Sequence, residues 1–403
     1  MAYLLPEEGP VAAGAAAPSS PPLLCAPSDG DSDAVFTVRR ALSAAAPVED
    51  ALTLPRADAV LSGQAPDTCA ARARVRDPAY SLRREVTSMV NYILDHQSDA
   101  GWFGGPANDA PGERDQYWPA WDILYSLLMY SEAVPDAAPR VQAALLRYVA
   151  EAERRLAAAP LDGWSSVRWP EWVAILQRMA DTFDVAPDGP ERAMLLRVAV
   201  TVAAQGFDWR GYFTDGSASP NFNTSVPFAP AWTLTEHGVN HAMALKEGAV
   251  AWRAGGGAPA AELSRLKVAL LDKLHGMPTG AFSADECLGG REPNRGVELC
   301  TIVETAYSLA LMHRTHGDIA LADRAERIIY NGLPGALSED MWVHNYLSQS
   351  NEIFAGHVEP HTWRTDGPDS TAYGLAPTYG CCTANFIQVR VLLALRVATR
   401  TCV

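Results

Sequence analysis

Two segments of the chain carry cysteine and carboxylate side chains at short spacing. The first holds Glu298 and Cys300, at a junction between a loop and a helical stretch, and the second holds the adjacent pair Cys381 and Cys382. Carboxylate oxygens and thiolate sulfurs are ligands of four-coordinate zinc, so these residues could complete a shell of one oxygen and three sulfurs. Spacing alone leaves two other interpretations open: Cys300 as a small buried hydrophobic residue, and the adjacent cysteines as a redox pair.

The number of cysteines also favours a metal centre or a catalytic site. The chain has seven cysteines in 403 residues. An odd number spread over such a length does not fit a disulfide-stapled scaffold. The remaining cysteines lie outside the two segments and carry no inference: Cys25, Cys69, Cys287 and Cys402.

Helical periodicity dominates the chain from about Leu82 onward. In the first such stretch Val86, Val90 and Ile93 recur at helical spacing and share one face. Alternation typical of a strand is clearest near 341–349. Further helices are predicted at about 118–133, 137–158, 170–185, 189–205, 237–254, 259–275, 299–315, 318–331 and 383–399.

Paired helices joined by loops fit either an α/α barrel or an α-solenoid. A solenoid would repeat with a fixed period of about 34 to 47 residues, and no such self-similarity is visible. We therefore predict an all-α fold, an (α/α)6 barrel over 76–403, with its site built from loops at one end of the helices. Residues 1–75 are rich in Ala, Pro, Ser and Gly, which predicts a disordered low-complexity segment.

Composition excludes several classes of protein. Hydrophobic residues make up 48% of the chain, enough for a globular core. The formal net charge is -15 and no basic cluster stands out, which argues against a nucleic-acid partner. No apolar run reaches the length of about 18 residues that a membrane span needs. The start lacks a signal-peptide pattern, which predicts a cytoplasmic protein, unless the true start lies elsewhere and allows secretion.

These motifs resemble those of glycoside hydrolase family 127, the β-L-arabinofuranosidase family of the six-hairpin glycosidase superfamily. Residues 298–300, Glu-Leu-Cys, look like the Glu-Thr-Cys motif of the family, and 380–385 look like its Cys-Cys loop. Between them, 317–331 match the helix that carries Ala-Asp, Glu-Arg and Tyr-Asn. The resemblance covers about 82–388. Upstream, three segments look like elements of one branch of the family: 101–104, 117–119 and 237–240.

The resemblance implies a zinc ion bound by Glu298, Cys300 and Cys382, with Cys381 as a nucleophile that also touches the metal. A free thiol has a pKa of about 8.5, and a bound metal lowers it, so a thiolate would persist at neutral pH. Leu299 stands where the family has Thr. This difference matters little if the side chain faces the core.

The resemblance also implies a general acid/base, which we place at Glu286 on the preceding loop. Asp285 stays an alternative because the offset to the metal-binding motif is shorter here than is usual. This carboxylic acid would protonate the leaving oxygen and then activate water, in a retaining double displacement with sulfur as nucleophile. The implied substrate is a non-reducing-end β-L-arabinofuranoside or a related glycoside, and Asn385 is a candidate for binding it.

Other residues are candidates for lining the sugar pocket. His237 and His241 lie four positions apart and would share a helix face, but no His-Glu-x-x-His pattern supports a second metal site. We expect one of them, with Asn240, to contact the sugar; a structural histidine is equally consistent. Trp102 and Trp118 could stack on a sugar ring, although packing is the more common role of such residues.

The resemblance breaks down at both ends of the chain. The segment that precedes the first barrel helices in the family is not found in 1–75, and after Asn385 the family continues into β-sandwich domains that do not follow here. We therefore expect a catalytic barrel that lacks the β-sandwich and is truncated at its C-terminal end. Two other functions compete: an inactive carbohydrate-binding relative, and another zinc-bearing α/α barrel such as a lanthionine-cyclase-like enzyme. The latter would need a Cys-His pair, and no such dipeptide occurs.

Overall fold

The fold is known from a computed structural model, which describes residues 82–103, 117–214, 233–338, 343–352, 354–357, 367–374 and 380–385. The predicted N-terminal segment 1–75 and most of the predicted helix 383–399 lie outside these ranges. Within them the chain is mostly helical, with a few short strands. This confirms the predicted all-α class. None of the helices in these ranges is both long and apolar enough to cross a membrane.

Most helices begin and end within a few residues of the predicted positions. They are α4 (Leu82–Asp95), α5 (Tyr117–Ala133), α6 (Ala138–Ala158), α7 (Gly163–Thr182), α8 (Pro190–Gln205), α9 (Trp209–Thr214), α10 (Gly238–Ala244), α11 (Glu247–Ala251), α12 (Gly257–His275), α13 (Leu299–His316) and α14 (Ile319–Gly335), with short helical turns at η1 (Pro135–Ala137) and η2 (Trp252–Gly256).

Three differences from the predicted helices have local causes. α7 begins at Gly163 rather than at Pro170, because Asp162 accepts a hydrogen bond at the helix start and the helix then continues through the proline. The predicted helix 237–254 is divided into α10, α11 and η2. The short helix α9 was not predicted, since six residues are too few to show a helical period.

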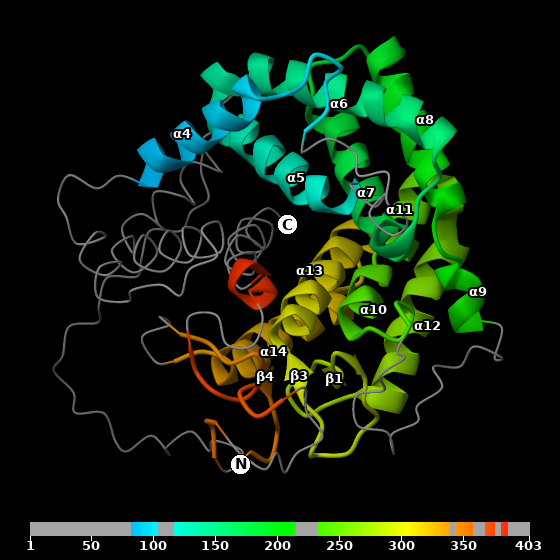
Figure 1. The fold of residues 1–403 in the computed structure, drawn as a ribbon. Coiled ribbons are helices and arrows are strands. Elements are labelled where there is room, and N and C mark those ends of the chain that lie inside the picture. Colours follow the sequence, from blue (N-terminus) through cyan, green and yellow to red (C-terminus); the bar gives the residue numbers. More distant parts are fainter. Residues whose placement is uncertain are drawn as a thin grey trace, which may run out of the picture.

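The helices form two layers that curve around a common centre (Figure 1). α5, α7, α10 and α13 pack side by side as the inner layer. α6, α8 and α14 pack against this layer from outside, and α12 packs against α11, which in turn contacts α7 and α13. Every residue from Leu299 to Leu309 of α13 is buried, as expected for a helix enclosed by others. By contrast α8 buries only Leu195, Val198, Ala199 and Val202. This layering is that of an α/α barrel.

A small sheet covers the N-terminal end of α13. Its strands are β1 (Ala284–Asp285), β2 (Cys287–Leu288), β3 (Val297–Glu298) and β4 (Leu347–Ser348), in the order β2-β1-β3-β4. β1 is antiparallel to β2 and parallel to β3, and β4 is antiparallel to β3. β4 falls within the predicted strand region 341–349. Because β3 runs directly into α13, the sheet fixes the loops on which the candidate site depends.

Candidate metal centre and active site

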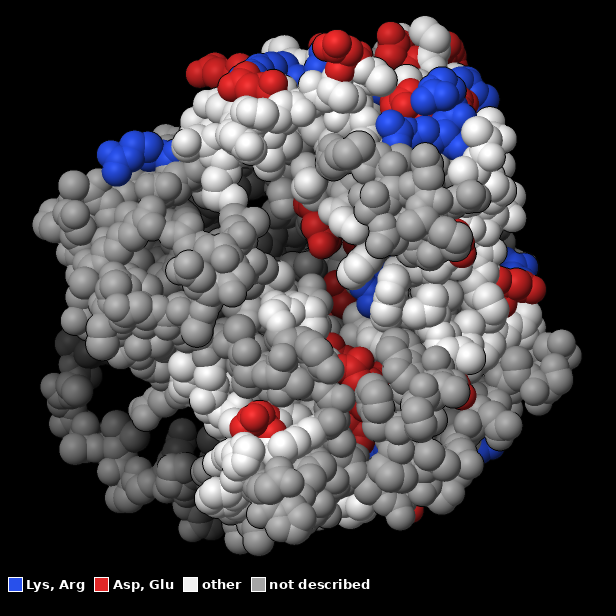
Figure 2. All heavy atoms as spheres, viewed as in Figure 1, with Lys and Arg blue, Asp and Glu red and all other residues white. Residues whose placement is uncertain are grey.

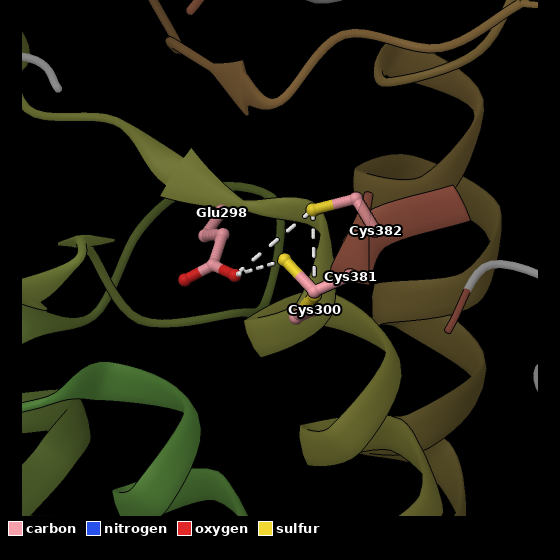
Figure 3. A group of neighbouring side chains, drawn as sticks. All are labelled: Glu298, Cys300, Cys381 and Cys382. Carbon is pink, nitrogen blue, oxygen red and sulfur yellow. Dashed lines mark hydrogen bonds between the residues drawn. The ribbon is translucent and has the colours of Figure 1, made fainter. Parts of the chain in front are cut away.

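Four side chains that are distant in sequence meet where the sheet joins α13: Glu298, Cys300, Cys381 and Cys382 (Figure 3). One ligand atom from each lies within 4.8 Å of all the others. The Sγ atoms of Cys300 and Cys382 are 3.3 Å apart. Oε1 of Glu298 lies 3.8 Å from Sγ of Cys381 and 4.0 Å from Sγ of Cys382. The structure thus brings together all four residues that the sequence suggested as zinc ligands.

Secondary structure positions each of these four residues. Glu298 ends β3 and occupies the N-cap position of α13 without a side-chain capping bond, and Cys300 lies in the first turn of that helix. Cys381 and Cys382 begin a helical turn at 381–385. This turn lies beside the start of α13 (Figure 3). A strand end and a helix start are stiff supports, so Glu298 and Cys300 are held close together on one continuous stretch of backbone.

Among the described residues, no Lys or Arg is in direct contact with this cluster of buried acidic groups, and Arg168 acts on it only without an ion pair. Glu298 is 1% exposed, its Oε2 has no hydrogen-bond partner, and no described Lys or Arg forms an ion pair with it. Burial raises the pKa of Glu298 and of the Cys300 and Cys382 thiols well above their usual values. A buried carboxylate without a countercharge is costly, and a bound cation would offset that cost. One oxygen and three sulfurs are the donor set of a zinc site, so the residues fit the ion.

Cys381 differs from the other two thiols of the cluster. It is exposed, whereas Cys300 and Cys382 are buried. Hydrogen bonds from Cys300 and Cys382 lower the pKa of the Cys381 thiol far below its usual value. A reactive cysteine needs both thiolate character and access for its substrate. Cys381 has both, and it sits at the open side of the cluster.

Glu286 lies next to the cluster in a backbone conformation that is rare for its type. Its φ of 74° makes it the only non-glycine residue with a positive φ among the described residues. It forms the turn between β1 and β2, and its carbonyl accepts a hydrogen bond from the Gly238 amide at 2.7 Å. A Cβ atom on Gly238 would lie 2.1 Å from that of Ala284, so glycine is required for this approach. Strain of this kind is typical of functional sites.

Two side chains hold the Glu286 carboxylate. The Tyr346 hydroxyl donates to Oε1, and Nε2 of His237 lies 3.2 Å from Oε2. Nδ1 of His237 accepts from the Asn240 amide at 3.4 Å, so the ring proton of a neutral imidazole lies on Nε2, facing Glu286. Burial lowers the pKa of His237, which favours this neutral form. His237, Glu286 and Glu298 also place one ligand atom each within 4.8 Å of one another.

The two alternatives for the acid/base have different surroundings. The Asp285 carboxylate forms a buried ion pair with Arg295. Burial raises the pKa of Asp285 to about 6, while the ion pair with Arg295 opposes that shift. Glu286 instead faces His237 and the cysteine cluster. The geometry therefore favours Glu286 for chemistry at the cluster and a structural ion pair for Asp285.

Three residues suggested for the sugar pocket lie in the core. Asn240 is fully buried, its Oδ1 accepts from Nε of Arg168 at 2.7 Å, and its Nδ2 donates to the Leu234 carbonyl at 2.7 Å. His241 is fully buried, with Nε2 2.7 Å from the Thr235 carbonyl oxygen. Trp102 is 3% exposed and stacks on Tyr148. All three are buried, and although Nδ1 of His241 and Nε1 of Trp102 have no hydrogen-bond partner, these atoms are closed to solvent. A sugar role for the three residues stays a prediction.

Two other suggested residues are closer to solvent. Trp118 is partly buried, and the guanidinium of Arg168 lies 4.3 Å from its ring centroid. Asn385 ends the turn that begins with the cysteine pair and is partly buried. Both are therefore accessible in part to a ligand, and their roles in binding a sugar stay predictions.

Sequence reasoning missed Tyr346, Arg168 and Trp164. Tyr346 follows the alternating pattern near 341–349, which indicated a strand but not its contact with Glu286. Arg168 and Trp164 lie on α7, where the predicted helix began too late to place them on the inner face. The sequence signal available for Arg168 was its place between Trp164 and Trp169 near the start of a buried helix.

A second buried polar cluster lies deeper between the inner helices. Nζ of Lys246 lies 2.6 Å from Glu171 and 2.9 Å from Glu304. Although burial opposes the charge, these carboxylates raise the pKa of Lys246. Glu171 and Glu304 also line a small cavity with Trp118 and Asp122. Figure 2 shows the face of the molecule seen in Figure 1, with acidic side chains along a hollow through its middle.

Comparison with known structures supports the barrel fold. No protein-family model matches the sequence, and no curated protein matches it. The structure is similar to a GH127 β-L-arabinofuranosidase from Geobacillus stearothermophilus T6, with a TM-score of 0.54, 14% identity, and coverage of 90% of this chain and 63% of that chain. A second similar structure, described as a glycoside hydrolase, has a TM-score of 0.53, 14% identity and coverage of 92% and 59%. Such likeness shows a shared α/α barrel glycosidase fold alone.

Proposed function

We propose that this protein is a zinc-dependent retaining glycosidase of the family 127 type, which cleaves β-L-arabinofuranosides or closely related glycosides. The observation that carries the proposal is the cluster of Glu298 and three cysteines, with ligand atoms within 4.8 Å of one another, directly beside Glu286. The sequence motifs at 298–300 and 380–385 and the barrel fold support the same assignment. A glycan is accordingly the expected substrate.

The metal would be held by Glu298, Cys300, Cys381 and Cys382, the four residues of the cluster. When bound, zinc lowers the pKa of ligand thiols and so keeps them as thiolates at neutral pH. The rest of the chemistry belongs to side chains of this chain. The chain spans about three-fifths of the two similar structures, 63% and 59% of their lengths, so the activity of those whole proteins is carried over as part of the proposal.

In the first step the Cys381 thiolate attacks the anomeric carbon of the sugar. A carbon–sulfur bond forms, the glycosidic carbon–oxygen bond breaks, and Glu286 donates its proton to the leaving oxygen. In the second step the Glu286 carboxylate removes a proton from water. The water oxygen bonds to the anomeric carbon, the carbon–sulfur bond breaks, and the Cys381 thiolate is released. Two inversions at one carbon retain the configuration.

Tyr346 and His237 would orient Glu286 for both proton transfers. Each contacts a different oxygen of its carboxylate, which leaves little freedom for the group to rotate. A general acid must lie within hydrogen-bond reach of the leaving oxygen, and a fixed carboxylate keeps that distance short. The exposed Cys381 and the held Glu286 thus form a nucleophile and an acid at one opening.

The proposal is tested by the zinc content of the purified protein. We expect one zinc per chain in the wild type and loss of that zinc in Cys300→Ala and Cys382→Ala, since each removes a sulfur from the cluster. Cys287→Ala is the matched control, because Cys287 lies outside the cluster and should leave the zinc content unchanged.

Activity is measured next with aryl β-L-arabinofuranosides, followed by other aryl glycofuranosides. Turnover with retained anomeric configuration, seen by proton NMR of the first product, is the expected result. A folded wild type without zinc would overturn the metal mechanism. A zinc-bound wild type without turnover of any of these glycosides would overturn the glycosidase and leave a carbohydrate-binding protein.

A further inference from the structure

Arg168 is a buried cation that forms no direct ion pair with a carboxylate of the described residues, although Glu304, Glu298 and Asp122 are close enough to favour its charge. It is 7% exposed, and no described Asp or Glu lies within ion-pair distance of its guanidinium. An arginine stays charged in a protein interior, so its burial needs compensation from other groups. The guanidinium faces the rings of Trp118 and Trp164, at 4.3 and 4.5 Å from their centroids. These cation–π contacts fix the plane of the group as well as stabilising its charge.

The one hydrogen bond described for Arg168 leads toward the candidate acid. Its Nε donates to Oδ1 of Asn240 at 2.7 Å, and the other side of the same amide donates to the Leu234 carbonyl. Both ends of Asn240 are therefore fixed. The backbone N–H of Asn240 donates to Nδ1 of His237. Nε2 of the same His237 ring lies 3.2 Å from Oε2 of Glu286.

We propose that Arg168 is a positioning residue for the acid/base: through Asn240 it fixes the His237 tautomer that donates to Glu286. The expected effect on catalysis rests on the proposed function. The expected effect on the His237 tautomer does not. With Nδ1 engaged as an acceptor, the ring must carry its proton on Nε2. Loss of Arg168 would release Oδ1 of Asn240, leave this buried amide held only at its Nδ2, and loosen the first turn of α10. His237 could then adopt its other tautomer, which presents a lone pair rather than a proton to Glu286.

A misplaced acid has a kinetic signature that a damaged nucleophile lacks. A poor leaving group such as an alkoxide needs the proton from Glu286, whereas an acidic phenol such as 2,4-dinitrophenol leaves without it. Damage to Cys381 would slow both substrates alike. General acid catalysis contributes about 10²- to 10⁴-fold, so partial misplacement should cost about 10- to 100-fold in kcat for alkyl glycosides.

The kinetic test compares Arg168→Gln with wild type on methyl and 2,4-dinitrophenyl β-L-arabinofuranosides, with zinc content matched. We expect kcat for the methyl glycoside to fall about 10- to 100-fold. For the dinitrophenyl glycoside kcat/KM, which reports the glycosylation step and not the later step that also uses Glu286, should fall less than about 3-fold. Asn240→Ala should give the same pattern, and the double variant should lose no more than either single variant. An equal loss on both substrates, or a raised KM with unchanged kcat, would overturn the positioning role.

A spectroscopic test is independent of activity. In ¹⁵N-histidine-labelled protein the wild-type His237 ring should give the signals of the Nε2-protonated tautomer, assigned by their loss in His237→Gln. Arg168→Gln should add the second tautomer. Arg178→Gln is the control, because Arg178 lies on the same helix but pairs with Glu132, away from His237. Identical His237 signals in Arg168→Gln and wild type would overturn the inference even if no glycoside is a substrate.

Discussion

Two buried polar clusters of the inner barrel make opposite use of charge. In the first, Lys246 lies between Glu171 and Glu304, so the cation and its counterions are all supplied by the chain. In the second, no described Lys or Arg forms an ion pair with Glu298, and Arg168 acts on Glu298 and Cys300 only without direct contact. Both are almost closed to solvent, yet only the first is complete by itself. The comparison separates a structural ion-pair network from a set of side chains that suits a bound cation.

The largest effect is expected at the exposed thiol of the second cluster. Cys381→Ala should lower kcat/KM at least about 10⁴-fold, because the nucleophile is removed and no other described thiol at the cluster is exposed. Steady-state kinetics on an aryl β-L-arabinofuranoside give this ratio. Cys287→Ala should retain wild-type kinetics. A Cys381→Ala variant with a tenth or more of wild-type turnover would contradict the assigned nucleophile.

The next effect concerns the stability of the first cluster. Lys246→Met should lower the free energy of unfolding by about 3 to 5 kcal/mol, since it leaves two buried carboxylates without their cation. Urea denaturation followed by circular dichroism measures the change. Arg140→Met removes an exposed ion pair with Asp95 and should cost less than about 1 kcal/mol. Equal losses in the two variants would mean that the Lys246 network is not the buried support described here.

Metal removal should affect only the second cluster. With free zinc at about 100 times its Kd, binding contributes about 2.7 kcal/mol to stability, and a chelator should remove that contribution from wild type. Cys300→Ala, which lacks a ligand, should unfold at the same urea concentration with and without chelator. Lys246→Met should keep the full chelator response. A wild type that is indifferent to the chelator while containing zinc would argue for a surface-bound ion.

The smallest effect is a pH dependence that belongs to the first cluster. Burial raises the pKa of Glu171 to about 7, against the opposing effect of Lys246. A carboxyl with a raised folded-state pKa favours the folded state at low pH, and this contribution is lost as pH rises through about 7. Glu171→Gln should therefore flatten the fall in unfolding free energy between about pH 5 and pH 8. The difference should be about 2.5 kcal/mol, because nearly two pH units of the interval from 4.5 to about 7 fall in this range and one pKa unit corresponds to about 1.4 kcal/mol.

Glu151 provides the matched control for that pH dependence. Hydrogen bonds from Arg154 and its neighbour Arg155 lower the pKa of Glu151 to about 2, while burial opposes them. Its contribution is lost only on acidification toward that pKa. Glu151→Gln should leave the slope between about pH 5 and pH 8 unchanged. An identical slope in Glu171→Gln and wild type would contradict the raised pKa.

The sequence alone determined the local features of this protein. Apolar residues at helical spacing predicted most helices to within a few residues, because periodicity encodes which face of a helix is buried. The Glu298–Cys300 pair and the adjacent cysteines indicated a metal centre through the chemistry of their side chains. The break of 237–254 into separate helices was not visible, since no residue in that stretch forces a helix to end.

Tertiary structure decided everything that depends on contacts between distant segments. It placed the turn of Cys381 against the start of α13, and it turned Glu286 rather than Asp285 toward the cluster through a positive φ. It also buried Asn240 behind Arg168. Sequence periodicity predicts which face of each helix is buried, but not which neighbouring helix packs against that face. The partners of a polar side chain are fixed only when the helices pack. In this protein those partners decide which polar residues belong to the candidate ligand site and which, like Asn240, belong to the core.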